Sequence, residues 1–155
     1  MTHFAFPNVE VLNADFIGCG RYLAAAEPVG NEYASCASII INQATVDRAV
    51  ALLAHEAALF PRQLYEKKDR RDKKYVGESM HLAYLLANLH CARRLRHAWP
   101  RDIWCTGKIA ITPDQQPVLQ EVGHEAEFSL KLTAFLDKTN PDTLFIAPTA
   151  NLRPN

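Results

Sequence analysis

A strongly apolar helical pattern follows a charged stretch in the middle of the chain, and it constrains the fold more than any other feature. The pattern begins at Ser79, and its apolar residues recur at helical spacing: Leu82, Leu85, Leu86, Leu89, Ala92 and Leu95. A stripe of this width has to be buried against another element. Three runs of β-type composition precede it, so we expect the helix to pack on a β-sheet.

The first half of the chain predicts a small antiparallel sheet followed by a helix. The expected strands cover residues 9–16, 21–27 (after a Gly-Cys-Gly turn) and 36–43. Thr45 is expected to cap an amphipathic helix whose apolar spacing extends to Leu64, with a break or kink at Pro61.

The second half of the chain predicts alternating strands and helices. We expect a strand at 103–111, a turn at Pro113-Asp114, extended chain at 117–119, a helix at 125–137 and a final strand at 144–147. The fold class predicted for residues 1–155 is therefore α+β, as a single domain with mixed β-sheets packed with about three helices.

Charge, cysteine usage and hydropathy exclude several classes of protein. The 155 residues contain 17 basic and 17 acidic side chains, so no net charge favours nucleic acid or an anionic membrane. The mixed-sign run at 67–74 is typical of a solvated segment, and no apolar run is long enough for a membrane span. Four widely spaced cysteines indicate buried free thiols. We therefore expect a cytoplasmic protein that binds neither membrane nor nucleic acid.

Ser79 is the main candidate for chemistry. A serine at a helix N-terminus lies beside free backbone N–H groups and the positive end of the helix dipole, which suits it to attack a carbonyl and stabilise the resulting oxyanion. The same position suits a plain helix cap. A serine hydroxyl needs a base, and Lys131, between Leu130 and Leu132 on a predicted amphipathic helix, can be that base only if burial disfavours its charged form. An exposed or snorkelling lysine is the alternative.

Five motifs in the second half of the chain resemble the proteolytic domain of Lon proteases. In chain order they are Gly77-Glu78-Ser79 before an apolar helix, Thr106-Gly107-Lys108-Ile109, Pro117-Val118-Leu119, Lys131-Leu132-Thr133-Ala134, and the closing strand Leu144-Phe145-Ile146-Ala147 with Pro148. The resemblance implies a Lon-like fold and a serine peptidase in which Ser79 and Lys131 form a catalytic dyad and Thr106 has an accessory role in holding the lysine. The alternative is a catalytically inactive Lon-like domain that serves as an assembly or recognition module.

The chain departs from the family pattern in two places. Met80 and His81 replace small residues and are expected to crowd the oxyanion region. The glycine-rich run before the lysine helix keeps only Gly123, and an alignment anchored there would put Glu127 or Phe128 in place of Lys131. We prefer the alignment anchored on Lys131, because the apolar spacing then agrees better.

The resemblance also implies partners. It indicates a protein or peptide substrate, a homo-oligomer, and a fused or partner domain such as an ATPase, since this sequence contains no Walker A loop. We expect no cofactor and no metal, because neither His55 nor His124 has the H-E-x-x-H spacing of a zinc peptidase.

Overall fold

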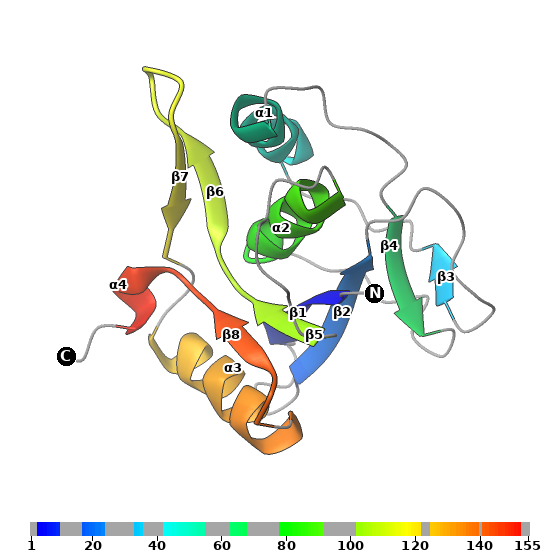
Figure 1. Cartoon of the computed structure of the whole chain (residues 1–155). Coiled ribbons are helices and arrows are strands. Elements are labelled where there is room, and N and C mark those ends of the chain that lie inside the picture. The colour runs from blue at the N-terminus through cyan, green and yellow to red at the C-terminus, as the bar shows by residue number, and fades with distance from the viewer. Residues whose placement is uncertain are drawn as a thin grey trace.

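A computed structural model describes nine segments of the chain: residues 3–9, 17–23, 33–35, 42–54, 63–67, 78–91, 102–121, 125–139 and 141–152. Within them lie eight strands and four helices: β1 (His3–Val9), β2 (Ile17–Leu23), β3 (Tyr33–Ser35), α1 (Gln43–Ala54), β4 (Gln63–Lys67), α2 (His81–Cys91), β5 (Asp102–Cys105), β6 (Lys108–Ile111), β7 (Pro117–Gln120), α3 (Glu125–Lys138), β8 (Leu144–Ile146) and α4 (Thr149–Leu152). The fold is mixed α/β (Figure 1).

The main sheet has six strands in the order β3-β4-β2-β1-β5-β8. The β1, β2, β3 and β4 strands pair antiparallel, with Phe4 opposite Tyr22 in the β1–β2 pair. On the other side β1 pairs parallel with β5, and β5 pairs parallel with β8. Parallel neighbours need long crossover connections, and α2 and α3 lie within the two that β5 requires.

Side-chain alternation along the central strands gives the sheet two apolar faces. Phe4 and Phe6 of β1 belong to one core cluster, whereas Ala5 between them belongs to another. In β5, Ile103 joins the first cluster and Trp104 the second. A period of two is what a strand buried on both faces requires. The sheet is therefore the middle layer between helices.

The helices cover these two faces as Figure 1 shows, with α1 and α2 on one side and α3 on the other. Leu82, Leu85 and Leu89 of α2 are buried in the first cluster, each contributing roughly 1.5–3 kcal/mol by leaving water. Ala134 of α3 packs in the second cluster beside Trp104. The described part of the apolar stripe predicted after Ser79 thus packs on the sheet as expected, and Ala92 and Leu95 lie outside the described residues.

The predicted strand at 103–111 is two strands in the structure. β5 ends at Cys105, Thr106 and Gly107 lie between strands, and β6 leaves the main sheet to form a separate hairpin with β7. Lys108 is opposite Gln120 and Ile111 is opposite Pro117 in this hairpin. Hydrophobic periodicity gives no sign of the break between β5 and β6, because the apolar pattern continues through it.

Several other predictions for the first half need correction. Gly18-Cys19-Gly20 is not a turn but lies inside β2, paired with Phe6, Pro7 and Asn8. β1, which ends at Val9, was not predicted, and Val9 is the one described residue of the strand expected at 9–16. β1 accommodates Pro7 at a position where its pairing with β5 has stopped at Ala5 and where β2 is its one neighbour among the described strands. Residues 10–16 lie outside the described segments.

The first predicted helix is shorter than expected. α1 begins at Gln43 rather than at Thr45, after Asn42 with φ 58°, a conformation that asparagine tolerates better than most residues. It ends at Ala54, and Leu64 lies in β4 instead of continuing the helix. Of the strand predicted at 36–43, residues 36–41 are outside the described residues, and the last two are wrong, because Asn42 lies in a turn and Gln43 begins α1. Pro61 and residues 68–74 of the mixed-charge run are also outside the described residues. Helical spacing persisted in the sequence beyond the point where the helix ends.

Predictions for the last third agree closely with the structure. The turn at Pro113-Asp114, the extended residues of β7 and the helix α3 lie where their patterns indicate. The final strand is β8. Cys105 is a buried free thiol, as expected for this position.

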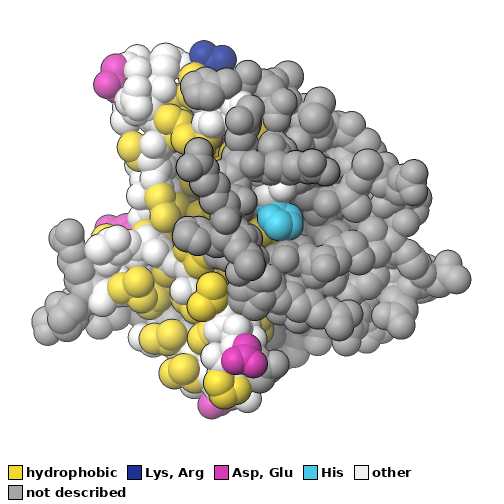
Figure 2. All heavy atoms as spheres, in the orientation of Figure 1, with side chains coloured by type: hydrophobic (Ala, Val, Ile, Leu, Met, Phe, Trp, Pro, Cys, Tyr) yellow, Lys and Arg dark blue, Asp and Glu magenta, His cyan; other side chains and the backbone are white. Residues whose placement is uncertain are grey.

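Apolar side chains are exposed on the side of the molecule formed by α3, β8 and α4. Leu136, Leu144 and Leu152 are the large exposed ones in these elements, and Figure 2 shows yellow side chains gathered over this region. None of the helices in the described segments is both long and apolar enough to cross a membrane.

Candidate active site

Ser79 lies in a tight turn immediately before α2. The His81 N–H donates to the Glu78 carbonyl at 3.1 Å, and the Tyr84 N–H donates to the Met80 carbonyl at 3.2 Å, so the turn leads directly into the helix. Ser79 itself is half-buried. The serine therefore precedes the first helical residue, beside the positive end of the helix dipole.

The break between β5 and β6 holds this turn in place. The Gly107 N–H donates to the Ser79 carbonyl at 2.9 Å, and the Gly107 carbonyl accepts from the Leu82 N–H at 3.1 Å. A Cβ at position 107 would lie 2.6 Å from Leu119 Cδ1 and 3.3 Å from Leu82 Cβ. The absence of a side chain thus allows the strand break to approach the start of α2 closely enough for both hydrogen bonds.

Lys131 is buried beside the same strand break. Its side chain is 1% exposed, and its Nζ donates to Thr106 Oγ1 at 3.1 Å. Thr106 is fully buried, and its N–H donates to the Ile146 carbonyl at 3.0 Å. Thr106 is therefore fixed by the end of β8 while its hydroxyl contacts the lysine. The snorkelling lysine considered from the sequence is not what the structure contains.

These contacts connect the three candidate residues through one short segment. Thr106 touches Lys131 through its side chain, and its neighbour Gly107 touches Ser79 through the main chain. The lysine comes from α3 and the serine from the turn before α2, and these two elements lie on opposite faces of the sheet. Each contacts the segment that follows β5, Lys131 at Thr106 and Ser79 at Gly107.

The residues that depart from the family pattern also have defined positions. Met80 is 2% exposed and packs in the first core cluster, and His81 is fully buried with Nδ1 accepting from the Ile109 N–H at 3.2 Å. Both side chains are thus directed into the core. Phe128, which the alternative alignment puts at the lysine position, packs against Phe145 with ring centroids 6.0 Å apart.

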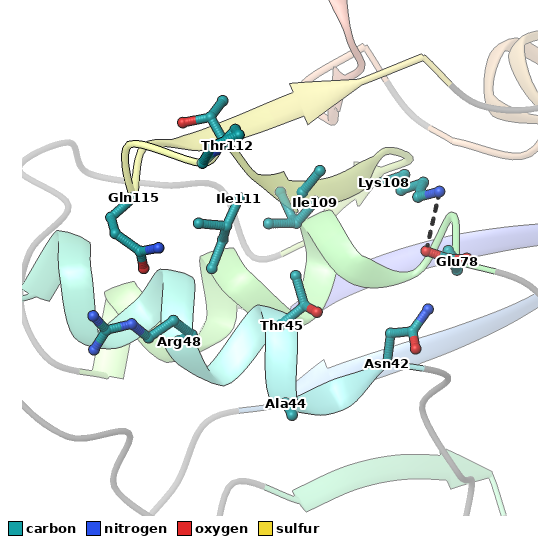
Figure 3. A pocket seen from close by; sticks show the side chains of 12 residues that line it. Asn42, Ala44, Thr45, Arg48, Glu78, Lys108, Ile109, Ile111, Thr112 and Gln115 are labelled. Atoms are coloured by element: carbon teal, nitrogen blue, oxygen red, sulfur yellow. Dashed lines mark ion pairs between the residues drawn. The ribbon is translucent and has the colours of Figure 1, made fainter.

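A groove next to the serine turn was not predicted from the sequence. It has a volume of about 700 Å³ and lies between the first half of α1 and the β6–β7 hairpin (Figure 3). We call it the α1–β6 groove. Glu78 and Lys108 form an ion pair of 3.5 Å at one end, and Arg48 lines it from α1. Two signals in the sequence could have indicated it. Glu78 and Lys108, in two of the motifs, carry opposite charges, and Thr45 and Arg48 are three residues apart on one helix.

The described segments hold no cluster of three or more His, Cys, Asp or Glu side chains that would suit a metal ion. Comparison with protein-family models, with curated proteins and with solved structures finds no match to this chain.

Proposed function

We propose that this chain is a Lon-like serine peptidase domain that hydrolyses peptide bonds with Ser79 as nucleophile and Lys131 as general base. The observation that carries the proposal is the buried Lys131 amine, which donates to Thr106 in the segment whose next residue binds the Ser79 turn. Burial at 1% exposure is the environment that disfavours an ammonium ion and so makes an amine a usable base.

The proposed reaction uses Ser79 as the nucleophile and Lys131 as the general base. Ser79 Oγ attacks the substrate carbonyl carbon while its proton passes to Lys131 Nζ, which gives a tetrahedral oxyanion. Collapse of this intermediate breaks the C–N bond, the leaving amine takes the proton from Lys131, and Ser79 is left as an ester. Water then attacks the ester with Lys131 again accepting a proton, which releases the acid and regenerates the serine.

Some of the backbone N–H groups near Ser79 are already hydrogen-bonded, which limits the donors that can hold the oxyanion. The N–H groups of His81 and Leu82 already donate to the carbonyls of Glu78 and Gly107. We assign the Ser79 N–H to the oxyanion, since it belongs to the turn before the helix and precedes these occupied donors. Thr106 acts as a positioning residue, because its fixed hydroxyl receives the lysine amine.

The experiment is hydrolysis of a fluorogenic protein substrate by the full chain and three variants. Ser79→Ala and Lys131→Met, which keeps the volume of the lysine side chain, should each lower the rate by at least about 10²-fold, the lower end of what a general base supplies. Ser129→Ala, at an exposed serine on α3, is the matched control and should retain the wild-type rate. Circular dichroism of each variant verifies that it is folded.

Two results would redirect the proposal. Full activity in Ser79→Ala or Lys131→Met would refute the assigned dyad. A folded wild-type chain that neither hydrolyses protein nor forms an adduct with a peptide boronate, which traps nucleophilic serines, would instead favour an inactive Lon-like module for assembly or recognition.

A further inference from the structure

The α1–β6 groove has one end at the serine turn. Glu78 and Lys108, which form the ion pair at that end, are the sequence neighbours of Ser79 and Gly107. Figure 3 shows Arg48 at the opposite end, with Thr45 and Ile109 between the two ends. A ligand in this groove would therefore extend from the serine turn toward Arg48.

The charges in the groove are unequal at its two ends. Glu78 and Lys108 offset each other, whereas Arg48 is exposed and forms no ion pair with any residue the structure describes. Its neighbour Asp47 accepts a hydrogen bond from the Tyr84 hydroxyl at 3.0 Å, and Asp114 accepts one from Thr112 at the hairpin turn. The Arg48 guanidinium thus has no ion-pair partner among the described residues, which favours an anionic ligand group there.

The wall of the groove between its ends is partly apolar. Ile111 of β6 is half-buried and Ala44 of α1 is exposed, and both line the groove, whereas Ile109 is 3% exposed and packs in the first core cluster. The four residues of β6 span about 13 Å, at roughly 3.3 Å per residue of strand. An extended peptide of about four residues beside β6 would cover this length, whereas a small anion would contact the Arg48 end alone.

We propose that the α1–β6 groove binds an extended peptide segment with a glutamate or aspartate side chain paired to Arg48 and apolar side chains against Ile111 and Ala44. The inference rests on the proposed function, because it makes this segment the part of the substrate that lies beside the bond attacked by Ser79. It adds a selectivity for acidic peptides, which the dyad itself does not determine.

Fluorescence polarisation of labelled pentapeptides tests the proposal in the Ser79→Ala background, where the proposed hydrolysis cannot consume the probe. Two peptides of leucine and alanine differ only in carrying one glutamate or one glutamine. The glutamate peptide should bind about two- to fivefold more tightly, the range for an exposed ion pair. Arg48→Gln should remove this preference and leave the affinity for the glutamine peptide unchanged.

Thr133→Glu is the matched control for net charge. It makes the same change of one charge unit at an exposed position on α3, across the sheet from the groove, and it should keep the preference for the glutamate peptide. Equal loss of preference in Arg48→Gln and Thr133→Glu would mean a long-range charge effect and overturn the proposal. So would equal affinity for the two peptides, no binding of either, or N-acetylglutamate binding as tightly as the peptide.

The same peptides separate this proposal from the peptidase assignment. Arg48-dependent binding without cleavage by the wild-type chain would leave the groove assignment standing and count against the peptidase. Cleavage that depends on Ser79 but is indifferent to Arg48 and to the glutamate would support the peptidase and overturn the acidic selectivity.

Discussion

Replacing Thr106 separates the role of its hydroxyl from the role of its bulk. Thr106 is fully buried, and its Oγ1 accepts the hydrogen bond from Lys131 Nζ at 3.1 Å. Thr106→Val keeps the shape but removes the acceptor, so Lys131 loses a buried hydrogen bond. The expected cost is about 1–3 kcal/mol of the free energy of unfolding, the range for loss of one buried hydrogen bond to an amine. In a chain of this length each kcal/mol lowers the melting temperature by about 2–4 °C.

Thr106→Ser is the matched comparison, because it keeps the hydroxyl and removes one methyl group. We expect it to cost about 0.5–1.5 kcal/mol, as loss of a single buried methyl does. Urea unfolding monitored by tryptophan fluorescence gives both values, provided that the slope with denaturant is unchanged. The two variants should therefore both be destabilised, and the valine variant at least as strongly.

Hydrolysis should distinguish these variants more clearly than stability does. Without the threonine hydroxyl the lysine amine loses the contact that positions it, and misplacement of a catalytic group by about 1 Å can cost about 10²-fold in rate. We expect Thr106→Val to lose about tenfold to a hundredfold and Thr106→Ser to keep most of the activity. Equal rates in the two variants, at temperatures where both are folded, would refute the positioning role of the hydroxyl.

Two further predictions concern stability alone. Gly107→Ala puts a Cβ 2.6 Å from Leu119 Cδ1, and we expect about 1 kcal/mol of destabilisation that shrinks when Leu119→Ala is added; additive effects in the double variant would contradict the close approach. Burial lowers the pKa of His90, which packs against Phe4, below its usual 6.5. As the pH falls below 6.5, His90 binds a proton in the unfolded state before it does so in the folded state. The stability that is present above pH 6.5 is therefore lost as the pH falls through the lower pKa of the folded state. Urea titrations give the free energy of unfolding of wild type and of His90→Gln at pH 7.5 and at pH 5.5. Wild type should lose more of this free energy between the two pH values than His90→Gln does, and an equal loss in both would contradict the prediction.

The elements that could be predicted from the sequence are those whose signals are local. α2 and α3 follow from apolar residues at helical spacing, and the turn at Pro113-Asp114 follows from its residue types, because these preferences act between residues a few positions apart. Gly18-Cys19-Gly20 is the counterexample: its local preference is for a turn, but pairing with β1 holds it in a strand. The correct assignment there depended on a partner strand rather than on the segment itself.

The candidate site was predicted only as a set of residue types. Ser79 before an apolar helix and Lys131 on an amphipathic helix were visible as candidates, and the resemblance to Lon proteases was what linked them and added Thr106. Their arrangement depends on contacts between distant residues, such as the Lys131–Thr106 hydrogen bond across 25 positions of sequence. No pattern within one segment encodes such a contact.

By itself, then, the sequence determined which segments have an apolar face and which residues can carry chemistry, because hydrophobic spacing and side-chain type are properties of the chain alone. Tertiary structure decided where β5 ends and β6 leaves the sheet, that Lys131 is buried rather than snorkelling, and that Arg48 faces a groove beside the serine turn. The physical reason is that burial and hydrogen-bond partners are set by which elements pack together, and packing joins residues that are far apart in the sequence.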